Sequence, residues 1–140
     1  MDHIGQFIIN HWGLCVLFVS ILAIILINEH LTKKMQGKEV SPQAAVELLN
    51  EESAIVVDLR DKETWRKGHI INAIHASDED FEKRRMDKYK TKTMILVCAR
   101  GTQAPALAKK LRSQGFTELL VLAGGMAAWQ GCDLPLVKGK

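Results

Sequence analysis

The sequence lacks several features that define common classes of protein. Its 140 residues include only three cysteines, Cys15, Cys98 and Cys132, which are widely spaced and odd in number. This arrangement argues against a disulfide framework and fits a reducing compartment. No CxxC pair occurs, and no set of cysteines and histidines has the spacing of zinc ligands. The net charge of +3 is too small to indicate a nucleic-acid-binding protein.

Basic residues are also absent from the first part of the chain. No Lys or Arg precedes Lys33, and the segment 7–27 is strongly apolar. A helix over this segment would be about 32 Å long, which matches a bilayer hydrocarbon core of about 30 Å. Trp12 would then lie near one interface as a belt residue. We therefore predict a transmembrane anchor at residues 1–30.

Two other interpretations of this segment fit less well. A cleaved signal peptide needs a basic start and a cleavage site with small residues, and neither is evident. A buried core helix would have to be covered all round by a domain of about 100 residues. Lys33, Lys34 and Lys38 follow the segment. Because positive residues stay on the cytoplasmic side, we predict a single-pass protein of the inner (cytoplasmic) membrane with a cytoplasmic C-terminal domain.

The rest of the chain alternates between strand-like and helix-like patterns. We predict a polar juxtamembrane linker at residues 31–40 and one domain at residues 41–140. Helices are expected after Ser41 and Asp61, which suit the N-cap position, and another is expected to end at Gly115. Three short apolar runs are typical of buried strands: residues 54–59, 93–98 and 118–123. The alternation predicts an α/β domain with a parallel sheet and helices on both faces.

Cys98 stands where a predicted strand passes into a helix that begins near Thr102. Ligands of open α/β sheets bind at this carboxyl edge, because the N–H groups of the loop and the first helical turn lack partners and attract anions. These groups would favour the thiolate, which is the nucleophilic form of a cysteine. Arg100 adds a positive charge that could meet an anionic substrate. A buried, inert cysteine fits the same pattern, so this alternative stays open.

Three motifs, in this order, resemble those of the rhodanese-homology domain, a family of sulfurtransferases. "VVDLRDKETWRKGHIINAIHA" at residues 56–76 resembles the family's strand, Asp-x-Arg turn and Gly-His-Ile-Pro-Gly-Ala segment. "CARGTQ" at residues 98–103 resembles its six-residue active-site loop, and "GGMAAWQGCDLPL" at residues 124–136 resembles its closing elements. The resemblance covers about residues 40–136. It implies a rhodanese-like fold and sulfur transfer that needs neither a metal nor an organic cofactor.

The resemblance also implies roles for single residues. Cys98 would be the nucleophile that carries sulfur as a persulfide, between a small anionic donor such as thiosulfate, or a protein persulfide, and a thiol or cyanide acceptor. Asp58 and Arg60 would brace the site, Trp129 would pack behind the loop, and His69 would be a hydrogen-bonded scaffold residue. The persulfide cradle, acting mainly through backbone N–H groups, would comprise Ala99, Arg100, Gly101, Thr102 and Gln103.

The sequence departs from the family pattern at three places. Ile71 and Asn72 replace the usual Pro-Gly, and the turn is expected to survive because Asn tolerates positive φ. Gln103 stands where the family often has Arg, Ser or Thr, which leaves substrate choice open. The sixth residue after Cys98 is Ala104, so the arginine of the longer loops in related phosphatases is missing. Phosphatase or arsenate-reductase activity is therefore not expected.

Other interpretations remain beside the enzyme. The domain could be a membrane-tethered adaptor that binds a membrane-protein partner, with little catalytic activity. Cys132 could resolve a persulfide or be an incidental surface thiol. The basic run at residues 83–85 could contact anionic lipid headgroups or form a solvated helix face.

Overall fold

The computed structural model describes residues 2–35 and 37–139, with side chains for residues 4–31 and 37–139. The side chains of Lys33 and Lys34, on which the predicted orientation partly depends, lie outside the described residues. The chain divides into two compact units, Met1–Lys34 and Met35–Lys140.

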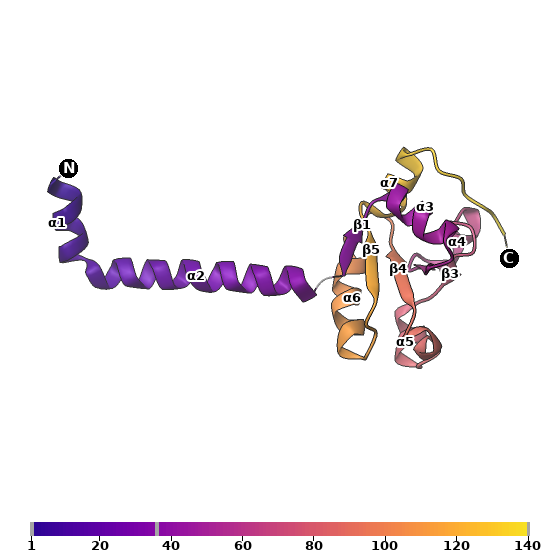
Figure 1. Cartoon of the computed structure of the whole chain (residues 1–140), viewed down its shortest axis with the longest axis horizontal. Coiled ribbons are helices and arrows are strands. Elements are labelled where there is room, and N and C mark those ends of the chain that lie inside the picture. Colours follow the sequence, from indigo (N-terminus) through magenta and orange to yellow (C-terminus); the bar gives the residue numbers. More distant parts are fainter. Residues whose placement is uncertain (1, 36, 140) are drawn as a thin grey trace. The chain divides into compact units, whose positions relative to one another are not determined.

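The first unit is helical. Helix α1, Asp2–Asn10, and helix α2, Trp12–Met35, are separated at His11 (Figure 1). Within α2, the segment Trp12–Leu31 has 20 residues and a mean hydropathy of 2.3, so it is long and apolar enough to cross a membrane. The prediction of one apolar N-terminal helix is confirmed, but its bounds differ. The apolar segment begins at Trp12 rather than at residue 7, and it extends beyond residue 27.

The predicted linker at residues 31–40 contains regular secondary structure at both of its ends. Helix α2 continues to Met35, because the polar residues after the apolar run are compatible with a helix and no Gly or Pro occurs between Ile27 and Gly37. Residues Lys38–Val40 then form strand β1. Two of its three side chains are exposed, so its sequence shows no strand pattern. Parallel pairing with β5 defines it, with Lys38 opposite Leu120.

The second unit contains a five-stranded sheet in the order β1-β5-β4-β2-β3, and every described pairing is parallel. This confirms the predicted sheet. The strand ends differ from the prediction by one residue, because Leu59, Cys98, Glu118 and Ala123 lie just outside the paired segments. The strands are β1 (Lys38–Val40), β2 (Ala54–Asp58), β3 (Ile74–His75), β4 (Thr93–Val97) and β5 (Leu119–Leu122).

Helices cover both faces of this sheet, as predicted (Figure 1). On one face, Leu96 of β4 lies in a core cluster with residues of α5 (Asp78–Glu82) and α6 (Ala104–Ser113). On the other, Val97 lies in a cluster with residues of α3 (Pro42–Asn50) and α7 (Gly125–Gly131). Successive strand residues alternate between the two clusters because side chains in a strand have a period of two. The remaining helices are α4 (Lys62–Lys67) and the short 3₁₀ helix η1 (Asp87–Tyr89).

The predicted helix ends are confirmed in the structure. The Ser41 hydroxyl accepts a hydrogen bond from the Ala44 N–H at 3.2 Å. The Asp61 carboxylate accepts one from the Thr64 N–H at 2.9 Å and one from the Thr64 hydroxyl at 2.6 Å. These two bonds, the hydroxyl bond first, hold the pKa of Asp61 below its ordinary value of 3.8. Gly115 has a φ of +98°, which suits the end of α6.

Candidate active site

Cys98 directly follows β4 at the carboxyl edge of the sheet. Its side chain continues the alternation of the strand and joins the core cluster on the α6 face. Only 2% of the residue is exposed. The neighbouring strand β2 ends beside it, with Asp58 opposite Val97 in the register. The thiol therefore lies at the base of the loop that leads into α6.

The loop 98–103 turns its backbone toward the sulfur. The Gly101 N–H donates to Cys98 Sγ over a nitrogen–sulfur distance of 3.1 Å. Gly101 has a φ of +79°, a conformation that L side chains rarely adopt. The N–H groups of the other four cradle residues donate to no acceptor among the described residues: Ala99, Arg100, Thr102 and Gln103. The loop thus offers one N–H group to the sulfur and four to an anionic group or solvent.

Helix α7 holds this loop from the other side. The Met126 N–H donates to the Cys98 carbonyl at 2.9 Å, and the Ala127 N–H donates to the Ala99 carbonyl at 3.0 Å. Gly125 has a φ of +60°, and a Cβ there would collide with the Cys98 carbonyl and lie 2.6 Å from the Gly101 nitrogen. Two N–H groups at the start of α7 therefore fix the loop, and glycine allows the close approach. In the sequence, only the glycine pair at the start of α7 indicates this contact.

Asp58 and Arg60 form a buried ion pair beside the loop. Arg60 Nη2 lies 2.7 Å from Asp58 Oδ2, and the two side chains are 8% and 1% exposed. The same nitrogen also donates to the Gly68 carbonyl at 2.7 Å, which ties the end of β2 to the end of α4. No described hydrogen bond joins either residue to the Cys98 sulfur. The geometry suits the bracing role that the resemblance implied.

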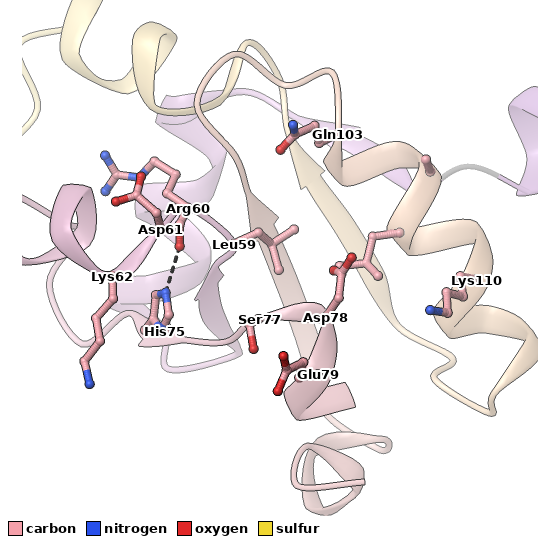
Figure 2. A pocket seen from close by; sticks show the side chains of 12 residues that line it. Leu59, Arg60, Asp61, Lys62, His75, Ser77, Asp78, Glu79, Gln103 and Lys110 are labelled. Atoms are coloured by element: carbon pink, nitrogen blue, oxygen red, sulfur yellow. Dashed lines mark hydrogen bonds between the residues drawn. The ribbon is translucent and has the colours of Figure 1, made fainter. Parts of the chain in front are cut away.

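His69 belongs to a scaffold of rings around Trp65. The His69 Nδ1 atom lies 2.8 Å from the Trp65 carbonyl, so this nitrogen donates if it carries the proton. The two rings stack with centroids 4.0 Å apart. His75 ends the edge strand β3, and its ring centroid lies 5.7 Å from that of Trp65. The His75 Nε2 atom is 2.7 Å from the Arg60 carbonyl (Figure 2). His69 is therefore hydrogen-bonded in the manner expected of a scaffold residue.

Trp129 and Cys132 lie away from the Cys98 side chain. Trp129 is buried in the cluster on the α3 and α7 face, and its indole N–H donates to the Pro135 carbonyl at 3.2 Å. Trp129 therefore supports the active-site loop indirectly, through α7, and does not pack against the Cys98 sulfur. Cys132 is an exposed thiol that accepts a hydrogen bond from Gln43 of α3 at 3.4 Å. The two thiols thus lie on opposite faces of the sheet, which favours the incidental role for Cys132.

A cavity of about 800 Å³ opens beside the cradle (Figure 2). Gln103 lines it from the start of α6, and its carboxamide makes no hydrogen bond to a described residue. Leu59 and Leu107 line the same cavity and also pack against the core cluster that contains Cys98. The other lining residues carry charges of both signs or polar groups, apart from one alanine: Arg60, Asp61, Lys62, His75, Ser77, Asp78, Glu79, Ala106 and Lys110.

Two further expectations are decided by the structure. Asn72 has a φ of +59°, so the turn survives the replacement of Pro-Gly as predicted. The expected helix face at residues 83–85 is wrong, because α5 ends at Glu82 and Arg84 has a φ of +58° in the turn that follows. The charges of this turn are paired locally, as Lys83–Glu79, Arg84–Asp87 and Arg85–Asp80, which favours a solvated turn over contact with anionic lipid headgroups. Among the described side chains, no group of three His, Cys, Asp or Glu residues is placed to hold a metal ion.

Comparisons with known proteins agree with this fold and loop. A family model described as a rhodanese-like domain matches residues 41–132. The chain is 34% identical over 143 residues to YibN of Escherichia coli, with all of both chains covered. It is 30% identical over 96 residues to the thiosulfate sulfurtransferase GlpE of Coxiella burnetii, across 69% of this chain and 90% of the relative.

A solved structure of a thiosulfate sulfurtransferase from Pseudomonas aeruginosa shares the fold, with a TM-score of 0.66 and 21% identity. The match covers 74% of this chain and 20% of that chain. The family model spans well over half of the residues, and the parallel sheet and the six-residue loop lie within the matched segment. The chain therefore belongs to the rhodanese family.

Proposed function

We propose that the protein is a membrane-anchored sulfurtransferase that carries sulfane sulfur as a persulfide on Cys98. One observation carries the proposal: the Gly101 N–H donates to Cys98 Sγ inside a loop whose other N–H groups have no described acceptor. A loop of this kind stabilises negative charge on the sulfur, and later on the outer sulfur of a persulfide. An inert core cysteine would not need it.

In the first half-reaction, the Cys98 thiolate attacks the sulfane sulfur of a donor such as thiosulfate. A new sulfur–sulfur bond forms at Cys98 Sγ, the sulfur–sulfur bond of the donor breaks, and sulfite leaves with the electron pair. The four free N–H groups of the loop can then hold the outer sulfur of the persulfide anion. The exposed Arg100 guanidinium, which forms no ion pair with a described residue, is suited to attract a doubly charged donor.

In the second half-reaction, an acceptor thiolate or cyanide attacks the outer sulfur. The bond to Cys98 Sγ breaks and the Cys98 thiolate is released, so atoms and electrons balance without a redox partner. We infer that acceptors approach through the cavity beside Gln103, because Leu59 and Leu107 connect its wall to the cluster around Cys98. The cavity holds groups much larger than cyanide, which favours a thiol acceptor.

The test is intact-protein mass spectrometry of the full-length protein after incubation with thiosulfate. We expect the mass of one added sulfur atom, located at Cys98, and its loss when a thiol is added. Cys98→Ser should take up no sulfur, because an alcohol is a poor nucleophile at neutral pH. Cys132→Ser is the matched control and should take up sulfur as the parent does. If the parent takes up none, the protein is better explained as an adaptor.

We also propose that the segment Trp12–Leu31 anchors the protein in the cytoplasmic membrane with the rhodanese domain in the cytoplasm. The segment has the required length and hydropathy. Basic residues follow it and none precede it. The test fuses a reporter after Lys140 that is active only outside the cytoplasm, beside one that is active only inside. Activity of the outside reporter would reverse the orientation.

A further inference from the structure

The backbone hydrogen-bond ladder of the N-terminal unit is interrupted where α1 meets α2. The His11 N–H donates to the Phe7 carbonyl at 3.0 Å, and the Cys15 N–H donates to the His11 carbonyl at 3.1 Å. His11 itself belongs to neither helix and lies in a turn between them. Helices α1 and α2 are therefore two helices and not one long helix.

This interruption limits which residues can lie in the hydrocarbon core of the bilayer. A backbone group left unpaired in hydrocarbon costs several kcal/mol, so a turn that interrupts the helix belongs where water or headgroups can pair with its backbone. The segment Trp12–Leu31 on the other side of the break has 20 residues. At 1.5 Å per residue it spans about 30 Å, the full hydrocarbon thickness. The segment Trp12–Leu31 therefore crosses the hydrocarbon core without any contribution from α1.

Helix α1 is nevertheless too apolar on one side to lie free in water. Ile4, Phe7 and Ile8 follow the spacing i, i+3, i+4 and therefore share one face of the helix. They are between 49% and 67% exposed in the protein. The ring of His11 extends the same face, since it lies 4.8 Å from the ring of Phe7. The opposite side carries the polar Gln6 and Asn10 and one apolar side chain, Ile9, which is 73% exposed.

We propose that α1 lies in the plane of the lipid–water interface, with the face of Ile4, Phe7 and Ile8 in the acyl boundary and the face of Gln6 and Asn10 toward water. The inference rests on the proposed membrane anchor, and places α1 on the side opposite the rhodanese domain. The bilayer is the partner because a single turn residue joins α1 to the span, at the depth where an interfacial helix lies. Since α1 has no Lys or Arg, its binding is hydrophobic and does not select anionic lipids.

The experiment measures the depth of single probes in full-length protein reconstituted in phosphatidylcholine vesicles. The background has its three cysteines replaced by serine, and single cysteines carrying a fluorophore are placed at Gln6, Ile8 or Leu22. Iodide quenches probes in water, and nitroxide-labelled lipids quench probes in the membrane. We expect iodide to quench Gln6→Cys several-fold more than Ile8→Cys, and the lipid quencher to show the reverse order. Leu22→Cys should lie deepest and be protected from iodide.

Positions 6 and 8 are only about 3 Å apart along a helix axis, so their difference reports the face and not the length. Equal protection of both probes would mean that α1 continues the span, and equal exposure would mean that it lies in water; either overturns the proposal. Protection of Ile8→Cys that disappears on dilution of protein in lipid would assign the face to a second copy, and would also overturn it. An exposed Leu22→Cys would instead overturn the membrane anchor itself.

A pair of additional substitutions checks the cause of the asymmetry. Phe7→Ser removes the largest side chain of the apolar face and should raise iodide quenching at Ile8→Cys toward the value of an exposed site. Gln6→Ser changes the polar face and should leave it unchanged. Salt and anionic lipid should have no effect on either probe. If Phe7→Ser changes nothing, the apolar face is not what holds α1 at the interface.

Discussion

Gly101 allows the sharpest test of how the cradle is built. A methyl group at this position would lie 2.9 Å from the Gly124 nitrogen, 3.1 Å from the Gly124 Cα and 3.2 Å from the Gly125 nitrogen. These neighbours are backbone atoms, and they belong to the turn that leads into α7. They cannot rotate away as a flexible side chain could. Gly101→Ala must therefore move the loop, move the turn, or do both.

The cost has two parts. An L-residue at a φ of +79° costs about 1–2 kcal/mol, and overpacking against fixed backbone costs about 1–3 kcal/mol. The free energy of unfolding should fall by about 2–5 kcal/mol, against a typical total of about 5–15 kcal/mol. The variant should still fold, with a urea midpoint lower by about 1–2 M. Because the Gly101 N–H would leave Cys98 Sγ, sulfur uptake should slow by about 10²-fold.

Gly131→Ala is the matched control. Apart from its chain neighbours and the backbone of its own helix, no described atom lies within 4 Å of the position of its Cβ, and the residue is the last of α7. The substitution should be neutral or stabilise the protein by about 0.5–1 kcal/mol. Both variants are compared as full-length protein in detergent, by urea unfolding and by the rate of persulfide formation in the mass spectrometer. A Gly101→Ala variant that matches the parent in both measurements would refute the close contact between the loop and the turn.

Three further substitutions test separate parts of the rhodanese domain. Arg100→Ala should raise the KM for thiosulfate more than it lowers kcat, because the guanidinium attracts the donor and does not touch the sulfur; an equal fall in kcat would contradict this. Asp58→Asn should lower the free energy of unfolding by about 3–5 kcal/mol in urea titrations, since it leaves the buried Arg60 charge unpaired, and a loss near zero would show that the pair does not brace the site. Hydrogen bonds from the Ser77 N–H and hydroxyl hold the pKa of Asp80 below its ordinary value of 3.8. Because the pKa is lower in the folded state, the ionised carboxylate stabilises the protein at pH values above the unfolded-state pKa, and this stabilisation is lost as the pH falls through the folded-state pKa. Asp80→Asn should therefore be less stable than the parent at pH 7, and the difference should disappear in acid. A difference in stability that does not depend on pH would contradict the assignment.

Much of the fold was predictable because its signals are local. The buried strands β2, β4 and β5 are continuous apolar runs, and Ser41, Asp61 and Gly115 mark helix ends through their own backbone and side-chain chemistry. The strand β1 was missed because three residues with two exposed side chains carry no pattern. Its position depends on pairing with β5, which is about 80 residues away along the chain. The break at His11 was missed as well, although Asn10, His11 and Gly13 interrupt the apolar run at this point.

The sequence by itself determined the chemistry of the candidate site: a thiol at the end of a buried strand, a six-residue loop and a glycine pair further on. Only the tertiary structure decided which groups meet around the thiol. The hydrogen bonds from Met126 and Ala127 to the loop carbonyls join segments that are almost 30 residues apart. Trp129 was expected to pack behind the loop, and the structure gives its partners: it is buried on the α3 and α7 face, and its indole N–H donates to the Pro135 carbonyl. The face on which a side chain lies, and the backbone it touches, depend on how strands and helices pack, and that packing is a property of the whole chain.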